Sequence, residues 1–175
     1  MKRLLRSLGS LAMTRLMSMN RPVFKNPSDI LRQKSEAVTR DELGSEETQT
    51  LIDDLLDSMR IENGIGIAAP QVGAHKRIII VDDGRGPEAY VNPEITARSI
   101  RKGHYIEEGC LSVPGIWGYV TRHKIVKVRA LNRDGEKVVL KVKDLPSVIF
   151  QHEIDHLDGI LFIDKADTYT RHPGM

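Results

Sequence analysis

The sequence lacks the features that mark several classes of protein. Cys110 is the only cysteine among 175 residues, which excludes an intramolecular disulfide and suits a reducing compartment. No run of about 18 apolar residues occurs, so we expect no membrane-spanning helix and no membrane partner. The formal net charge is only +2, which argues against a DNA-binding protein. Hydrophobic residues make up 40% of the chain, enough to bury the core of about one domain.

Acidic residues are also missing before Asp29, whereas lysine and arginine recur there. We interpret residues 1–20 as a basic N-terminal extension that is either dispensable or an organellar targeting segment. Residues 21–165 are expected to form one domain, and residues 166–175 a short tail.

Hydrophobic periodicity predicts two helices. Residues 51–60 place apolar side chains on one face and aspartates on the other, and this helix should end at Asn63–Gly64. A second helix should begin near Pro146, since proline suits the first helical turn, and end near Gly159.

Short runs rich in β-branched residues predict strands at 78–81, 125–130 and 138–142. The last two should form a hairpin through a turn at Asp134–Gly135, and Asn92–Pro93 should mark another turn. Because strands precede one strong helix, we expect an α+β fold with antiparallel or mixed strands packed around a C-terminal metal-binding helix.

The clearest chemical signal is His152-Glu153-Ile154-Asp155-His156 on that last helix. Residues four apart lie on one helical face, so His152 and His156 can bind one metal ion. Glu153 stands beside them, where a carboxylate can accept a proton from water. The alternative is a helix with two ordinary histidines.

A catalytic metal centre needs a third protein ligand. Metallopeptidases with the same histidine pair use a later His or Glu, but Phe162 stands where the His would be and no Glu follows Glu153. Cys110 is the best candidate, because a thiolate binds borderline metals well. Weaker candidates are other histidines and aspartates: His75, His104, His123, Asp158, Asp164, Asp167 and His172.

The third feature is the small-residue segment 64–71, Gly-Ile-Gly-Ile-Ala-Ala-Pro-Gln. It lacks the Gly-Lys-Ser/Thr ending of a phosphate loop. Its small side chains would let a substrate backbone lie close, and Gln71 could donate an amide hydrogen bond.

Segments 64–71, 108–112 and 152–156, in this order, resemble the three motifs of the peptide deformylase family. The resemblance implies a hydrolase that removes the formyl group from N-formylmethionine at the start of nascent polypeptides and releases formate. It also implies one divalent metal ion held by Cys110, His152 and His156. That ion would natively be Fe²⁺, and Zn²⁺, Ni²⁺ or Co²⁺ can substitute for it.

The same resemblance assigns roles to further residues. Glu153 would be the general acid and base, while the Gln71 side chain and the backbone N–H of Leu111 would stabilise the negative oxygen of the intermediate. Arg122 would pair with Glu108 and brace the loop that carries the cysteine.

The substrate-binding residues would include a segment that pairs with the peptide backbone and an apolar pocket for the methionine side chain. The backbone contacts are assigned to Gly64, Ile65 and Gly66, and the pocket walls to Ile106, Leu145, Val148 and Ile149. Trp117 departs from the polar or basic residue that many relatives have there.

The implied partners are N-formylmethionyl peptides and, transiently, the ribosome with its nascent chain. The expected location is the cytoplasm, or a mitochondrion or plastid if residues 1–20 are a transit peptide. Two alternatives stay open: a metallopeptidase that cuts internal peptide bonds, and an inactive, metal-stabilised module on the ribosome.

Overall fold

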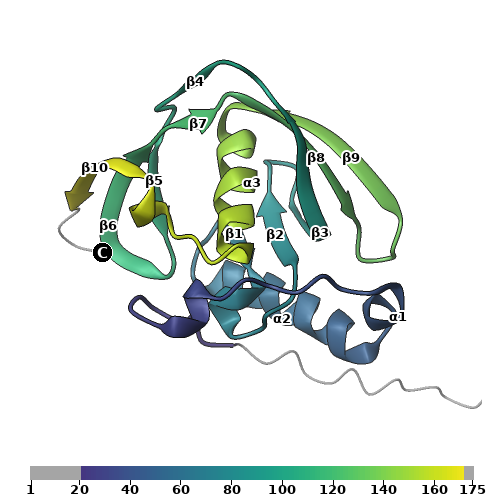
Figure 1. The fold of residues 1–175 in the computed structure, drawn as a ribbon. Helices are drawn as coiled ribbons and strands as arrows, with labels where there is room; N and C mark the ends of the chain where they lie inside the picture. Colours follow the sequence, from purple (N-terminus) through teal and green to yellow (C-terminus); the bar gives the residue numbers. More distant parts are fainter. Residues whose placement is uncertain (1–20, 172–175) are drawn as a thin grey trace, which may run out of the picture.

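The computed structural model describes residues 21–171, and in it helix α3 (Asp144–Leu157) lies between two β-sheets (Figure 1). The larger sheet has the order β1-β2-β3-β8-β9, and all its strands pair antiparallel. Its strands are β1 (Gly66–Ala68), β2 (Ile78–Asp82), β3 (Pro87–Arg98), β8 (Ile125–Leu131) and β9 (Lys137–Lys143). The α+β fold class is therefore confirmed.

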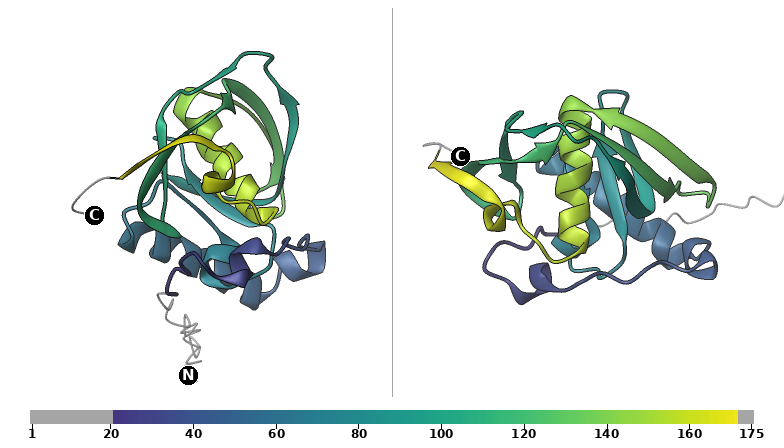
Figure 2. Two further views of the ribbon diagram at one scale, coloured as in Figure 1. Left: turned by 60° about the vertical axis from the view of Figure 1, so that its left-hand side comes forward. Right: turned by 45° about the horizontal axis from the view of Figure 1, so that its top comes forward.

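The second sheet has three strands in the order β10-β6-β5 and stands on the other side of α3 (Figure 2). It consists of β5 (Glu107–Cys110), β6 (Val113–Val120) and β10 (Ala166–Arg171). The short strands β4 (Lys102–Gly103) and β7 (Arg122–His123) pair with each other. Residues 166–171 therefore belong to a sheet, although we expected them in a short tail. The expected extension at 1–20 and residues 172–175 lie outside the described residues.

Helix α2 (Glu46–Ile61) contains the predicted helix and begins earlier than the apolar pattern does. Ser45 caps it by accepting a hydrogen bond from the backbone N–H of Thr48 at 3.2 Å. Its buried face packs against the larger sheet. The remaining short helices are α1 (Arg40–Leu43), η1 (Asp29–Arg32), η2 (Ala69–Val72) and η3 (Phe162–Asp164). Within residues 21–171, no helix is long and apolar enough to cross a membrane.

The hairpin of β8 and β9 is confirmed, but the turn predicted at Asn92–Pro93 is wrong. These residues lie inside β3, at a bulge where the pairing with β8 shifts between Val91 and Glu94. Asn92 has a φ of 51°, in the left-handed region that strands rarely use. Its side chain accepts a hydrogen bond from the N–H of Val38 and donates one to the C=O of Val38. The preference of this dipeptide for a turn therefore produces a bulge within β3 and does not end the strand.

Helix α3 starts at Asp144, two residues before Pro146, so the proline falls in the first turn, where its missing N–H costs nothing. The helix is buried on most sides, because sheets lie on both flanks. Phe150 and Leu157 are fully buried and pack with Tyr90 and strand β8. The same burial carries the polar residues of α3 into the interior.

Candidate metal centre and substrate cleft

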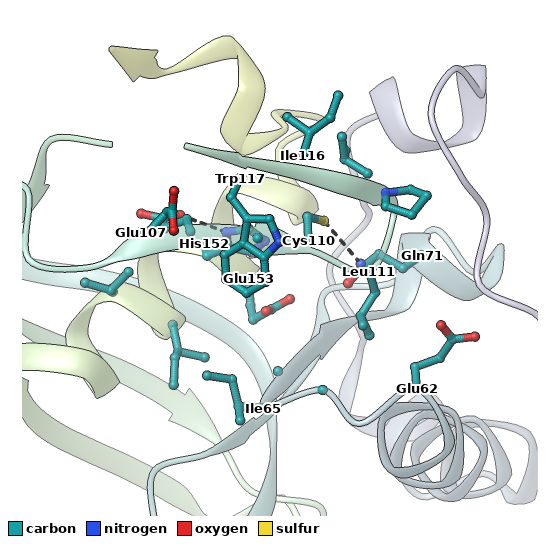
Figure 3. Close-up of a pocket in the computed structure, with 18 of the residues that line it drawn as sticks. Glu62, Ile65, Gln71, Glu107, Cys110, Leu111, Ile116, Trp117, His152 and Glu153 are labelled. Atoms are coloured by element: carbon teal, nitrogen blue, oxygen red, sulfur yellow. Dashed lines mark hydrogen bonds and ion pairs between the residues drawn. The ribbon is translucent and has the colours of Figure 1, made fainter. Parts of the chain in front are cut away.

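Cys110, His152 and His156 come together although the cysteine lies far from the two histidines in the sequence. Cys110 ends β5, and the two histidines lie on the buried face of α3. Their ligand atoms all lie within 4.8 Å of one another, and Cys110 Sγ is 3.2 Å from His156 Nε2. The structure thus places the three predicted ligands side by side. Figure 3 shows two of them, Cys110 and His152, at the cleft.

This donor set fits a divalent transition metal. One sulfur and two imidazole nitrogens suit zinc or ferrous iron, and three protein ligands leave a coordination position for water. Burial alone would raise the pKa of the Cys110 thiol, but the neighbouring His156 and His152 outweigh it and hold the pKa well below its usual value. Since the thiolate is the form that binds metal, the electrostatics match the geometry.

A buried charge network supports the first histidine. His152 Nδ1 lies 2.9 Å from Glu108 Oε2, so the other ring nitrogen, Nε2, can face the ligand cluster. Glu108 accepts two hydrogen bonds from Arg122, at 2.8 and 2.9 Å, which confirms the predicted pairing. Arg122 also donates to Asp155 at 2.6 Å, and Lys165 bonds the same carboxylate from outside.

The charges of this network act on the pKa of Glu108. Burial would raise the pKa of Glu108, but Arg122 and His152 outweigh it and lower that pKa to about 2.

Asp155 was not predicted as a partner of Arg122, although its place between the two histidines was a signal. Asp155 is not part of the ligand cluster, and its carboxylate bonds Arg122 and Lys165 instead.

Glu153 is buried, with 4% of its surface exposed, and its Oε2 has no hydrogen-bond partner within residues 21–171. Burial raises its pKa to about 7, against the opposing pull of His152 and His156. A carboxylate with such a pKa can both accept and donate a proton near neutrality.

Gln71 and Leu111 lie next to Cys110. Gln71 Oε1 accepts from the N–H of Ala68 at 2.8 Å, which turns its Nε2 toward the cysteine, 3.8 Å from Sγ. The same Nε2 donates to the hydroxyl of Ser112 at 3.1 Å, and the Ser112 N–H lies 3.4 Å from Sγ. Ser112 was not singled out from the sequence, although it stands within the second motif.

An open cleft of about 540 Å³ leads to this cluster (Figure 3). All seven predicted substrate-binding residues line it: Gly64, Ile65, Gly66, Ile106, Leu145, Val148 and Ile149. Ile65 and Leu145 are exposed, while Val148 and Ile149 are buried. A side chain at Gly66 would overlap Glu153 and Ile149, so only glycine allows β1 to approach the carboxylate so closely.

Three more residues of the cleft were not among the predicted substrate-binding residues. Trp117 lines the cleft, and its ring packs on Gly109, where a Cβ would come within 2.9 Å of it. Lys25 and Glu62 also line the cleft and were not predicted, because no local motif surrounds either residue.

Within residues 21–171, none of the weaker metal candidates joins the cluster of Cys110, His152 and His156. His104 pairs instead with Asp167, at 2.6 Å. Asp164 binds Arg32 and the Leu161 N–H, and Asp158 binds Arg77. The ring of His123 lies 2.7 Å from the Ser99 carbonyl, and His172 is outside the described residues.

Known proteins resemble this chain closely. A sequence model of the polypeptide deformylase family matches residues 20–172. A peptide deformylase of Acetivibrio thermocellus is 46% identical over 145 residues, which cover 82% of each chain. One of Desulfitobacterium hafniense is 48% identical over 145 residues, covering 82% of this chain and 93% of the relative. The Met-Ala-Ser-bound crystal structure of a class I type b peptide deformylase from Acinetobacter baumannii superposes with a TM-score of 0.81 at 42% identity, covering 85% of this chain and 99% of that one.

Proposed function

Because the chain belongs to the peptide deformylase family, whose members are enzymes that remove formyl groups from nascent peptides, we propose that it hydrolyses the formyl amide of N-formylmethionine and releases formate. The observation that carries the proposal is the meeting of Cys110, His152 and His156 directly beside the buried Glu153.

In this proposal Cys110, His152 and His156 hold one divalent cation, natively Fe²⁺, which Zn²⁺, Ni²⁺ or Co²⁺ can replace. When bound, the cation supplies positive charge that acidifies a water molecule and polarises the formyl oxygen. Glu108 and Arg122 keep the His152 ring turned toward the ligand cluster.

Glu153 handles the proton. Its carboxylate accepts a proton from the attacking water as the new bond forms between the water oxygen and the formyl carbon. It then gives the proton to the methionine nitrogen as the carbon–nitrogen bond breaks, leaving formate and a free amine. The pKa of about 7 lets Glu153 act in both directions at neutral pH.

The formyl oxygen gains negative charge in the intermediate, and Gln71 Nε2 and the Leu111 N–H are proposed to donate hydrogen bonds to it. Loss of one such donor costs about 2.7–4 kcal/mol of barrier in enzymes that form similar intermediates. The contact of Gln71 Nε2 with Ser112 supports this role, because it fixes the amide on the cysteine's side of the cleft.

The peptide is proposed to lie along β1, which is the edge strand of the larger sheet and leaves backbone groups of Gly64–Gly66 at the cleft. Pairing with an edge strand reads any peptide backbone, and the apolar walls at Ile106, Leu145, Val148 and Ile149 select methionine. The Met-Ala-Ser ligand of the Acinetobacter baumannii relative supports a peptide substrate of this kind.

We also propose that the protein acts transiently at the ribosome, where formylated chains emerge. Because the relatives come from bacteria, the proposed location is the cytoplasm.

A formate-release assay tests the proposal. The protein, purified without oxygen and loaded with Fe²⁺ or Ni²⁺, should release formate from formyl-Met-Ala-Ser and leave casein intact. Glu153→Gln should keep its metal and lose about 10³-fold or more in kcat/KM. Cleaved casein without formate would instead indicate the metallopeptidase, and a fully active Glu153→Gln would show that the proton acceptor is another group.

A further inference from the structure

Three successive residues, Phe24, Lys25 and Asn26, run across the two segments that carry the proposed oxyanion donors. The Phe24 N–H donates to the carbonyl of Gln71 at 2.8 Å, and the Asn26 N–H donates to the carbonyl of Ser112 at 2.7 Å. Between them, Lys25 Nζ donates to the carbonyl of Leu111 at 2.9 Å. We call Phe24–Asn26 the crossing segment.

The two donor-bearing segments are far apart in the sequence. Gln71 belongs to η2, which follows β1, whereas Leu111 lies between β5 and β6. A site that stabilises a developing charge needs its donors held to within about 0.5 Å. The Gln71 to Ser112 side-chain bond links the segments from within the cleft, and the crossing segment links the same two segments through their carbonyls.

The crossing segment is itself anchored. Just before it, Arg21 Nε bonds Asp54 on α2 at 2.7 Å, and Ser58 of α2 donates to the Arg21 carbonyl. Beyond η2, Gly73 has a φ of +86°, and a Cβ there would lie 2.9 Å from the Phe24 ring. The segment is therefore held by contacts with α2 and with Gly73, the residue that ends η2.

Lys25 makes the one contact of the three that a side chain supplies, so it alone can be tested by substitution without changing the backbone. Its Nζ also lies 3.3 Å from Glu62 Oε2, but both side chains are well exposed, so this ion pair contributes little by itself. The hydrogen bond to the Leu111 carbonyl is charge-assisted and restrains the residue whose N–H is proposed to face the substrate.

From this arrangement we propose that Lys25 is a positioning residue for deformylation: through the Leu111 carbonyl, and together with the backbone of Phe24 and Asn26, it holds the Leu111 N–H and the Gln71 amide at the spacing that the charged intermediate requires. This inference rests on the proposed function. Lys25 acts through Leu111 and does not itself carry out a chemical step.

Lys25→Met keeps the length of the side chain and removes the donor, and Lys25→Arg keeps a donor. Lys34→Met is the matched control, because Lys34 is exposed and does not line the cleft. For Lys25→Met we expect kcat with formyl-Met-Ala-Ser to fall about tenfold, since small misplacements of reacting groups cost up to about 10²-fold. The Tm should stay within about 1 °C of wild type. Metal content and the Kd for the product peptide Met-Ala-Ser should stay within about twofold of wild type, because the donors act on the intermediate.

Lys25→Arg should recover most of kcat, and Lys34→Met should match wild type. The inference is overturned if Lys25→Met keeps the wild-type kcat. It is also overturned if kcat falls only in step with Tm and metal content, or only through a weaker Kd for Met-Ala-Ser. A wild-type enzyme that releases no formate would refute the proposed function instead, so the two failures are distinguishable.

Discussion

The ligand cluster and the cleft that leads to it are built in opposite ways. Behind the ligands, Glu108 and Arg122 are almost fully buried, and each is bonded to several partners. At the cleft, Ile65 is 52% and Leu145 is 41% exposed, and glycines bring the backbone to the surface. The cluster thus depends on charge contacts between residues that are far apart in the sequence. The cleft depends on its shape and on backbone groups, which most side-chain substitutions leave in place.

If this contrast is correct, the largest effect on stability should come from breaking the buried network. Arg122→Met would leave Glu108 and Asp155 without their shared cation. Removal of one partner from a buried ion pair costs about 3–5 kcal/mol, so we expect a loss of that size in the free energy of unfolding, measured by urea titration.

Arg129→Met is the matched control. Arg129 pairs with Glu94 on the exposed face of β8 and β3, where both side chains are about 60% accessible. Its loss should cost less than about 1 kcal/mol. Equal losses in the two variants would show that burial does not distinguish the cluster from the surface.

The pH dependence of stability sharpens the same contrast. Glu108 has a pKa of about 2 in the folded protein, against 4.5 as its reference value. A lowered folded pKa stabilises the protein above the reference pKa, and this stabilisation is lost as the pH falls from about 4.5 toward 2. The metal-free wild type should therefore lose up to about 3 kcal/mol over this range.

Glu108→Gln should lack that part of the acid dependence, while Glu94→Gln, on the exposed face, should keep it. The pKa of Glu153 is shifted in the opposite direction, from 4.5 to about 7. Its contribution to stability is therefore present below about pH 4.5 and is lost as the pH rises through 7. Urea titrations at several pH values measure both slopes. Identical acid slopes for Glu108→Gln and wild type would contradict the assignment.

The smallest effect on stability should come from the rim of the cleft. Leu145→Ala removes an exposed apolar wall, so it should raise KM for a formyl-Met peptide several-fold and change the free energy of unfolding by less than about 1 kcal/mol. A destabilisation as large as that of Arg122→Met would place Leu145 in the core rather than in the pocket.

Much of this arrangement could be predicted from the sequence. The spacing of His152 and His156 indicates one helical face, and the β-branched runs at 125–130 and 138–142 indicate the hairpin that was found. The pairing of Arg122 with Glu108 followed from the resemblance alone. These predictions succeeded because local period and ordered motifs carry them.

The failures share a physical cause. At Asn92–Pro93 the dipeptide has a strong turn preference, but pairing with β8 and the bonds to Val38 override it. The contacts of Lys25 with Leu111 and of Arg122 with Asp155 join residues far apart in the chain, and no local sequence pattern predicts such contacts.

The proposed chemistry depends most on one metal ion bound through Cys110. Elemental analysis of protein purified without oxygen tests this directly, with Cys110→Ala beside wild type and His104→Ala as a histidine control outside the cluster. Wild type and His104→Ala should each hold about one equivalent of metal, and Cys110→Ala less than about a tenth of that. A folded Cys110→Ala that keeps a full equivalent would contradict the central claim.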